Sequence, residues 1–219
     1  MTKTRRKRRR LTGWFAASLL VVLGALYAFY PRHPSLTAFD AAAMARAEAA
    51  MWRDYYEKRY PALFYELYAV ARDQQGFSPV DSLRIGFFAA RAAYRFQASR
   101  SRAEADVALP DLIDYYALLA RAAPGPVDIE YAARKELDWW QARRENVGPD
   151  AYGRTVAQVA TALYGVDNAD LRRSGVLRAQ AMAYRDAHSR DMTEADWDEI
   201  ARRLDESYRL LKQAIASKP

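Results

Sequence analysis

The chain has 219 residues and a net charge of +7, with 51% hydrophobic and 28% charged residues. These proportions are typical of a folded protein with a sizeable core, and they argue against a largely disordered chain. Seven of the 34 Lys and Arg residues lie in residues 1–10, which contain no acid, and the remaining 27 balance the 27 Asp and Glu residues. The neutral remainder disfavours nucleic-acid binding. Cysteine is absent, which excludes disulfides, thiolate metal sites and cysteine nucleophiles.

Residues 11–30 form an uncharged and mostly apolar run, LTGWFAASLLVVLGALYAFY. As a helix with a rise of about 1.5 Å per residue, this run would cover roughly 30 Å, the hydrocarbon thickness of a bilayer. Aromatic side chains favour the headgroup boundary, and here they lie near both ends of the run, at Trp14, Tyr27 and Tyr30. We therefore predict an N-terminal transmembrane signal-anchor helix over residues 11–30.

Residues 1–10 are predicted to form a basic cytoplasmic tail. Basic flanks resist translocation, and the other end of the apolar run has only Arg32 and His33 nearby. The predicted topology is a single pass through the inner (cytoplasmic) membrane, with the N-terminus cytoplasmic and the C-terminal domain extracytoplasmic. The residues that determine this topology are Arg5, Arg6, Lys7, Arg8, Arg9 and Arg10.

A cleaved signal peptide is the alternative to an anchor, because it also joins a basic segment to an apolar one. Residues 25–31, ALYAFYP, offer no pair of small residues at the spacing of a cleavage site, so we favour an uncleaved anchor. The usage of amino acids, rich in alanine and arginine and poor in lysine, favours a bacterial protein. The domain is then expected on the periplasmic side of a bacterial membrane.

After a linker at residues 31–37, the sequence predicts an extracytoplasmic, all-helical domain over residues 38–219. No stretch alternates apolar and polar residues with a period of two. Pro61 and Pro110 should each kink or split a helix, because proline lacks an amide hydrogen and clashes with the preceding turn. Hydroxyl N-caps are predicted at Thr37, Ser78, Ser101 and Thr193, with a strict capping box only at Ser101–Glu104. The predicted helices span residues 38–75, 79–99, 102–123, 129–146, 150–164, 168–188 and 194–217.

This pattern predicts an all-α fold, with the membrane helix followed by an irregular antiparallel bundle of about seven to nine helices. A helical-hairpin array is the alternative. The predicted helix at 194–217 has one regular apolar stripe, which also suits a partner helix and leaves self-association open. The stripe comprises Trp197, Ile200, Leu204, Tyr208, Leu211 and Ile215.

Metal, cofactor and nucleophile sites are not predicted. The only histidines are His33 and His188, too few for the common zinc and di-iron patterns. Glycine-rich phosphate loops are also missing from the sequence. We therefore predict no catalytic residue, no metal ligand and no cofactor-binding residue.

Two predicted helices each place a carboxylate, aromatic rings and an arginine on one face. Such a row forms either an Arg–carboxylate bridge under aromatic rings or a cleft in which the pKa of the carboxylate is raised. Adjacent residues on a helix point about 100° apart, so neighbouring rings cannot all lie on one narrow stripe. Some of them must fill a helix that packs on two sides or reach a surface. The rows are Glu48, Trp52, Tyr55 and Arg59, and Glu136, Trp139, Trp140 and Arg143.

From these features we expect a membrane-anchored extracytoplasmic interaction module of unknown biochemical role. The alternative is an envelope enzyme that uses carboxylates on the aromatic-lined helices, such as Glu48, Glu57 or Glu136. The expected partners are the lipid bilayer and another envelope protein or a second copy of the chain, but neither nucleic acid nor a metal. Surface Tyr and Trp side chains are enriched at protein interfaces. The predicted interaction face comprises Tyr55, Tyr56, Glu136, Trp139, Trp140 and Arg143.

Overall fold

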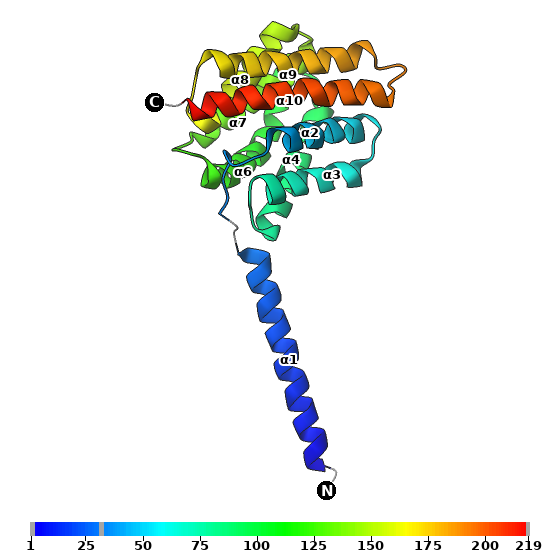
Figure 1. Ribbon diagram of the computed structural model, residues 1–219, viewed down its shortest axis with the longest axis vertical. Coiled ribbons are helices and arrows are strands. Elements are labelled where there is room, and N and C mark those ends of the chain that lie inside the picture. Colours follow the sequence, from blue (N-terminus) through cyan, green and yellow to red (C-terminus); the bar gives the residue numbers. More distant parts are fainter. Residues whose placement is uncertain (1–2, 31–32, 218–219) are drawn as a thin grey trace.

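The computed structural model describes the backbone of residues 3–30 and 33–217, and the side chains of residue 14 and of residues 17–30 and 33–217. Every regular element in these ranges is a helix, so the predicted all-α bundle is confirmed for the described part of the chain (Figure 1). The long helices are α1 (Lys3–Phe29), α2 (Ala41–Tyr56), α3 (Tyr60–Ala69), α4 (Pro79–Ala98), α6 (Leu109–Leu119), α7 (Ile129–Glu145), α8 (Pro149–Tyr164), α9 (Ala169–Ala187) and α10 (Glu194–Ala216). The short ones are η1 (Val70–Gln74), α5 (Arg102–Ala105), η2 (Asp106–Ala108) and η3 (Ala120–Ala122).

Both prolines that the sequence analysis singled out divide helices. Pro61 is the second residue of α3, which follows a break after α2. Pro110 is the second residue of α6, which follows the short α5 and η2. Proline is tolerated in the first turn of a helix because the amide it lacks has no intrahelical partner there. Each of the two prolines therefore lies at the start of a new helix.

Of the four predicted hydroxyl caps, the one at Thr37 is wrong. The helix begins three residues later, where a carboxylate oxygen of Asp40 accepts the amide hydrogen of Ala43 at 2.7 Å. Thr37 instead lies in the preceding turn, 3.0 Å from the hydroxyl of Ser35. A carboxylate is as good an acceptor for these orphan amides as a hydroxyl. The other three caps, Ser78, Ser101 and Thr193, are confirmed.

The full capping box lies at the start of α10 and not at Ser101. The Thr193 hydroxyl accepts from the amide of Asp196, whose carboxylate accepts from the amide of Thr193 at 2.9 Å. These bonds and one from Tyr184 lower the pKa of Asp196 to about 2. At the predicted box, the carboxylate of Glu104 turns to the amide of Arg100 instead, at 2.8 Å.

The helices after α1 form a closed ring. Consecutive members pack on one another from α2 through α3, α4, α6, α7, α8, α9 and α10, and α10 then packs back on α2 (Figure 1). Short connections favour neighbouring, oppositely directed helices. The return of α10 to α2 joins the two ends of the domain, so the large side chains of several helices meet in the middle of the ring.

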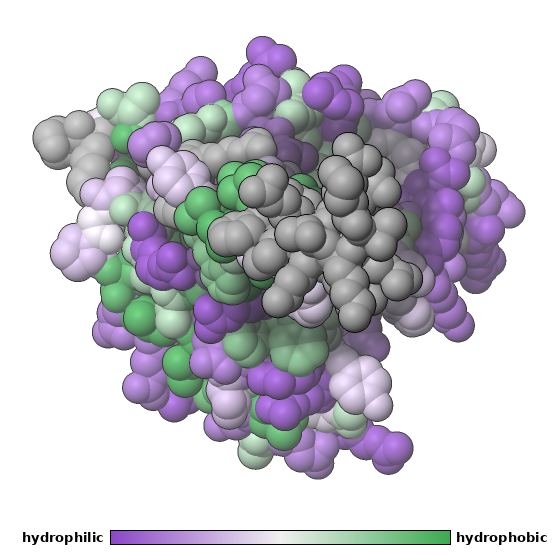
Figure 2. All heavy atoms as spheres, turned by 90° about the horizontal axis from the view of Figure 1, so that it is seen from below, coloured by the Kyte–Doolittle hydropathy of each residue, from purple (hydrophilic) through white to green (hydrophobic). Residues whose placement is uncertain are grey.

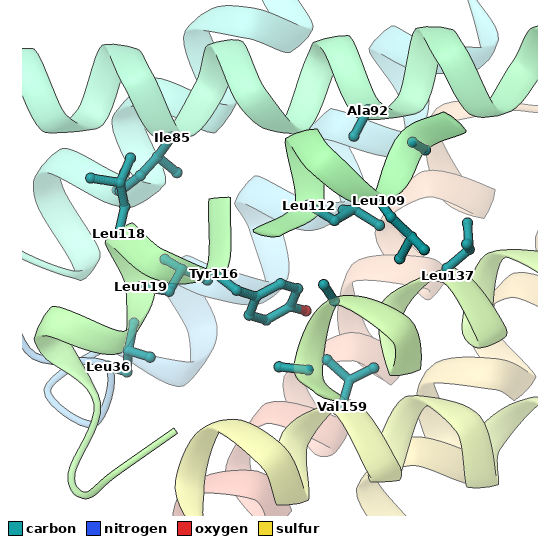
Figure 3. Close-up of a cluster of buried hydrophobic side chains, with 14 of the residues drawn as sticks. Leu36, Ile85, Ala92, Leu109, Leu112, Tyr116, Leu118, Leu119, Leu137 and Val159 are labelled. Atoms are coloured by element: carbon teal, nitrogen blue, oxygen red, sulfur yellow. The ribbon is translucent and has the colours of Figure 1, made fainter. Parts of the chain in front are cut away.

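Two large apolar cores lie within the ring, beside a smaller cluster of Ala157, Leu171 and Ala214. One joins α4, α6, α7 and α8, with the fully buried Tyr116 at its centre among Leu112, Leu119 and Val159 (Figure 3). The other joins α2, α7, α9 and α10, and it contains most of the apolar stripe predicted on the last helix. That stripe is therefore occupied by α9 and α2 of the same chain.

The helix α1 projects away from this ring (Figure 1). Seven of its large aliphatic and phenylalanine side chains between residues 19 and 29 are 51–71% exposed. The predicted interface aromatics Trp14, Tyr27 and Tyr30 are also exposed, and the guanidinium of Arg72 lies 5.8 Å from the Tyr27 ring centroid. The face of the domain turned toward α1 carries hydrophobic patches inside a mainly hydrophilic edge (Figure 2).

As far as the residues are described, none of the helices combines the length and the hydropathy of a membrane span. The side chains predicted to determine topology lie outside the described residues; they are those of Arg5, Arg6, Lys7, Arg8, Arg9 and Arg10.

Candidate functional site

Three neighbouring hollows lie among the helices of the ring, and Tyr55 and Ala93 line all three. The outer chamber, of about 440 Å³, lies between α3 and α4 and is lined by Tyr60, Leu63, Phe64, Leu67, Ala90, Tyr94 and Gln97. The inner chamber, of about 260 Å³, is lined by Met51, Trp52, Leu63, Leu67, Ala89, Ala90, Leu112, Tyr115, Glu136 and Trp140. The side chamber, of about 300 Å³, is lined by Trp52, Tyr56, Phe96, Gln97, Trp139, Trp140, Arg143, Tyr152, Arg178 and Met182.

Glu136 is the carboxylate at the wall of the inner chamber. Its oxygens accept hydrogen bonds from the Tyr116 hydroxyl and from the Trp140 indole, each at 2.8 Å. Burial raises the pKa of Glu136 to about 7, although these two bonds and the charge of Arg178 act to lower it. Because a carboxyl group in water titrates near pH 4, Glu136 is set to exchange a proton close to neutrality.

A second carboxylate, that of Glu48, lies near the first and has a cation of its own. One of its oxygens pairs with the guanidinium of Arg178, and the other accepts from the Tyr208 hydroxyl at 2.7 Å. Glu48 is buried and the side chain of Arg178 is 15% exposed, and the charge of Glu48 raises the pKa of Arg178 although burial opposes it. The Arg178 guanidinium also covers the Trp139 ring, 4.2 Å from its centroid.

The far wall of the side chamber holds a more exposed ion pair. Arg143 donates to Asp186 at 2.7 Å and to the Tyr56 hydroxyl at 3.3 Å. Trp139 is fixed by a 2.6 Å bond from its indole nitrogen to the Tyr152 hydroxyl. The aromatic rings of this chamber are therefore held in place by polar bonds at their edges.

The six residues of the predicted interaction face all line this cavity. Tyr55, at 38% exposure, is the most accessible of them, and Glu136, at 8%, is buried. The structure therefore brings Trp52 and Tyr55 of α2 together with the predicted row of α7 around the hollow. Arg59 of the first predicted row lies beyond the end of α2 and pairs with Asp54 and Glu57, and Glu48 pairs with Arg178.

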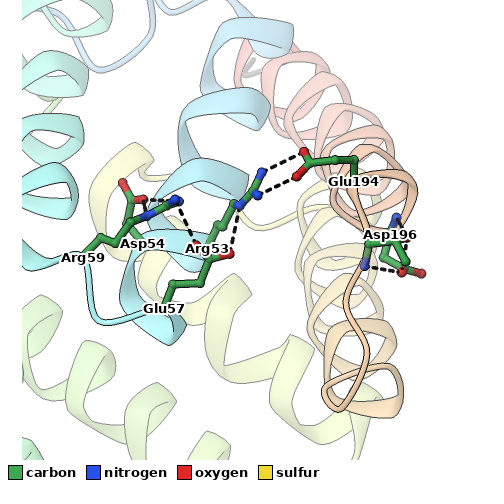
Figure 4. A network of polar contacts seen from close by, with 7 residues as sticks. Arg53, Asp54, Glu57, Arg59, Glu194 and Asp196 are labelled. Carbon is green, nitrogen blue, oxygen red and sulfur yellow. Dashed lines mark hydrogen bonds and ion pairs between the residues drawn. The ribbon is translucent and has the colours of Figure 1, made fainter.

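The third candidate carboxylate, Glu57, and two further acids, Glu66 and Asp114, line none of the three chambers. Glu57 is bound between Arg53 and Arg59 in a surface network that also links Arg53 to Glu194 of α10 (Figure 4). Glu66 is half-buried on α3, where loss of solvent raises its pKa. Asp114 is exposed on α6.

The two histidines contribute nothing to the cavity. The ring of His188 stacks on Tyr184 at the end of α9 and bonds to the backbone carbonyl oxygen of that residue at 2.8 Å. His33 precedes the domain with a positive φ of 56°. Among the described residues, no three His, Asp or Glu side chains are grouped closely enough to hold a metal ion.

Sequence reasoning missed Tyr116, Arg178 and Tyr208 as parts of the site. Tyr116 is four helices away from Arg178 along the chain, and no spacing within one helix connects them. The available signal was weak: Tyr208 belongs to the predicted stripe of α10, and Arg178 is a cation in an otherwise small and apolar stretch of α9. Only the closure of the ring brings these side chains to the two carboxylates.

Comparison of the chain with protein-family models, with curated proteins and with solved structures finds no match.

Proposed function

We propose that this protein is a membrane-anchored extracytoplasmic binding module, and that the aromatic cavity in its helical ring is the binding site. Concave, mostly apolar hollows with a few fixed polar groups are the usual form of ligand sites. The three chambers combine such a lining with Glu136, and their volumes of about 260–440 Å³ lie in the range of small ligands and side chains. This combination is the observation that carries the binding function.

The anchor is proposed from the sequence. Residues 11–30 contain no charge and follow a block of seven basic residues, the arrangement expected of a signal anchor with a cytoplasmic N-terminus. The exposed apolar side chains of α1 make few contacts with the rest of the chain, and an apolar surface of this kind requires a covering. A lipid bilayer is the covering that fits an uncharged run of this length.

The topology is tested with reporters joined after residue 219. An alkaline phosphatase fusion should be active and a green fluorescent protein fusion dark, and the chain should resist extraction by alkaline carbonate. A chain beginning at residue 34 should lose both properties. A dark phosphatase fusion together with a bright fluorescent one would refute the proposed compartment.

Binding is tested by comparing the native chain with the Ala93→Phe variant, because Ala93 lines all three chambers. A phenyl ring at this position should fill part of the shared space. We expect an envelope component to be recovered with the native chain from gently solubilised membranes, and to be lost with the variant. Equal recovery from both chains would remove the cavity as the binding site.

The second candidate function is an envelope enzyme, which the titration of Glu136 favours. A carboxyl group with a pKa of about 7 can act as a general acid or base at neutral pH. The two functions are distinguished by identifying the compound that copurifies with the native chain and with Glu136→Gln. If the protein is an enzyme, the variant should carry unreacted substrate and the native chain should carry product. If it is a binding module, both chains should carry the same compound.

A further inference from the structure

The charge on the wall of the inner chamber is exclusively negative. Of its described lining residues, Glu136 alone is charged, and the others are alanine, leucine and methionine side chains or aromatic rings. The rings come from three helices, with Trp52 and Tyr55 on α2, Tyr115 on α6 and Trp140 on α7. The chamber therefore joins one carboxylate to several aromatic rings in a mostly apolar space.

The buried charges around this chamber do not balance. Glu48 pairs with Arg178, and within the described part of the chain Glu136 makes no ion pair. Buried charges are normally paired, because an unpaired charge loses its hydration without compensation. The titratable and charged groups that face Glu136 are Glu48 from α2, Tyr115 and Tyr116 from α6, and Arg178 from α9, whereas α3 contributes leucines and α4 alanines to the chamber. When Glu136 is ionised, this group has two carboxylates and one guanidinium.

We propose that the inner chamber binds an organic ammonium group carried on an apolar chain. The ammonium lies against the Glu136 carboxylate and the rings of Trp52, Tyr55 and Trp140, and the chain extends into the outer chamber. Aromatic faces attract cations, and the attraction is strongest where water is excluded. The inner and outer chambers share Tyr55, Leu63, Leu67 and Ala90 as lining residues, and the proposed apolar chain passes between these side chains into the outer chamber.

An anionic ligand fits this chamber less well. The two arginines of the cavity line the side chamber and not the inner one, and each already has a carboxylate partner: Arg178 pairs with Glu48, and Arg143 with Asp186. An anion at Glu136 would place two negative charges together, whereas a cation neutralises the excess. The charge of the site therefore selects the sign of the ligand.

The proposal couples ligand binding to the proton of Glu136. Since the pKa of the ligand-free carboxyl is about 7, a cation must displace a proton below that pH and none above it. Between pH 8 and pH 6 the affinity for a permanently charged ammonium should fall roughly tenfold. A quaternary ammonium keeps its charge over this pH range, so the fall in affinity would come from protonation of Glu136 and not of the ligand.

This inference rests on the proposed function of the cavity as a binding site, and it is tested on the full chain in bilayer nanodiscs of zwitterionic lipid. The five tryptophans are replaced by 5-fluorotryptophan and followed by fluorine magnetic resonance. The probes are octyltrimethylammonium, octanol and octanoate, which share a chain length and differ in charge. Trp52, Trp139 and Trp140 line the cavity, Trp197 lines none of its three chambers and reports on the packing of α10, and Trp14 is expected to report on the bilayer.

We expect octyltrimethylammonium to shift the cavity resonances at pH 8, with an affinity at least tenfold above that of octanol, and to leave Trp197 unchanged. Glu136→Gln should keep the fold, because the amide can still accept from Trp140, but should remove both the preference for the cation and the pH dependence. The matched control Glu57→Gln, at an exposed carboxylate outside the cavity, should keep both.

Equal affinity for octanol and the ammonium, or an unchanged preference in Glu136→Gln, would overturn the inference. The result with octanol separates this failure from that of the proposed function. If octanol shifts the fluorine resonances of the cavity tryptophans in the native chain, and Ala93→Phe prevents this shift, the cavity remains a binding site. Only the assignment of an ammonium ligand is then wrong. If no probe shifts them, the proposed function fails as well.

Discussion

The seam between α8, α9 and α10 and the cavity between α2, α3, α4 and α7 show two ways of packing helices in one ring. In the seam, Gly153 of α8 lies against the backbone of α9, where an added Cβ would be 2.6 Å from the Cα of Val176. Between α9 and α10, the hydroxyls of Ser174 and Ser207 each donate to the carbonyl oxygen of the other residue, at 2.8 and 2.9 Å. Small side chains leave no space here.

The cavity is lined by the largest side chains of the protein, and these do not close it. The indole of Trp140 is bonded to Glu136, that of Trp139 to Tyr152, and the Gln97 amide to the Tyr55 hydroxyl at 2.5 Å. A ring that is fixed at its edge cannot rotate to fill the neighbouring space, and interiors normally contain few voids larger than a water molecule. We therefore expect the seam to contribute stability and the proposed binding function to use the cavity. Four predictions test this division.

The largest effect is expected at the pair that joins the two regions, Glu48 of α2 and Arg178 of α9. Arg178→Met removes the guanidinium and leaves a buried carboxylate without its partner. Breaking such a pair costs about 3–5 kcal/mol of unfolding free energy, which urea denaturation would measure. The double variant Glu48→Leu, Arg178→Met should regain much of this loss, because it leaves no unpaired charge. A single variant as stable as the native chain would contradict the assigned pair.

The next largest effect is expected from a glycine-to-alanine substitution, which should destabilise the seam but not the helices around the cavity. Gly153→Ala should lower the unfolding free energy by about 3 kcal/mol, at the upper end of overpacking penalties, because its Cβ would overlap the α9 backbone. Gly86→Ala is the matched control on α4, where the Cβ would lie 3.4 Å from the Phe64 ring. The gain in helix propensity should make this variant up to about 1 kcal/mol more stable. Equal losses at both glycines would remove the distinction.

A pH-dependent effect is expected at Glu136. The folded-state pKa of about 7 lies above the ordinary 4.5, so the folded chain retains a proton that the unfolded chain releases. The stability contributed by this group is complete below pH 4.5 and is lost as the pH rises through 7, by about 3 kcal/mol in total. Glu136→Gln should lack this decrease, so its stability relative to the native chain should improve from pH 5 to pH 8. Parallel curves for the two chains would show that the carboxyl is not buried as described.

The smallest effects belong to the surface contacts at the start of α10. Thr193→Ala removes the capping box and should cost about 1 kcal/mol. Glu194→Gln weakens the ion pair with Arg53, in which the glutamate side chain is 77% exposed, and should change stability by less than about 0.5 kcal/mol. Both differences are measurable as shifts in thermal midpoint. A larger loss from Glu194→Gln than from Thr193→Ala would reverse the expected order.

The positions of most helices could be predicted from the sequence, but the residues that meet at the candidate site could not. Prolines 61 and 110 and the caps at Ser78 and Thr193 act within a few residues, so local chemistry places these helix starts. Thr37 failed because Asp40 provides an equivalent acceptor one turn later, and local rules do not rank the two. The anchor over residues 11–30 stays a prediction.

The predicted rows left two environments open, an Arg–carboxylate bridge under aromatic rings and a cleft, and periodicity could not decide between them. Periodicity shows that Tyr55 or Trp140 lies beside a carboxylate on its own helix, but it does not show what lies opposite. The opposite wall is supplied by Ala90 and Ala93 of α4, and the countercharge by Arg178 of α9. These contacts depend on the closure of the ring, which joins residues more than a hundred positions apart. Such long-range pairing leaves no periodic signal in a single sequence.

The most direct test of the cavity as the binding site of this protein is photo-cross-linking in intact cells. The photoreactive residue p-benzoylphenylalanine would replace Tyr55, which lines all three chambers, and in a control chain Tyr131, which is exposed on α7 away from them. We predict an adduct of defined mass at position 55 that is lost with Ala93→Phe and does not form at position 131. The same adducts at both positions, or an adduct at position 55 that Ala93→Phe leaves unchanged, would contradict the account.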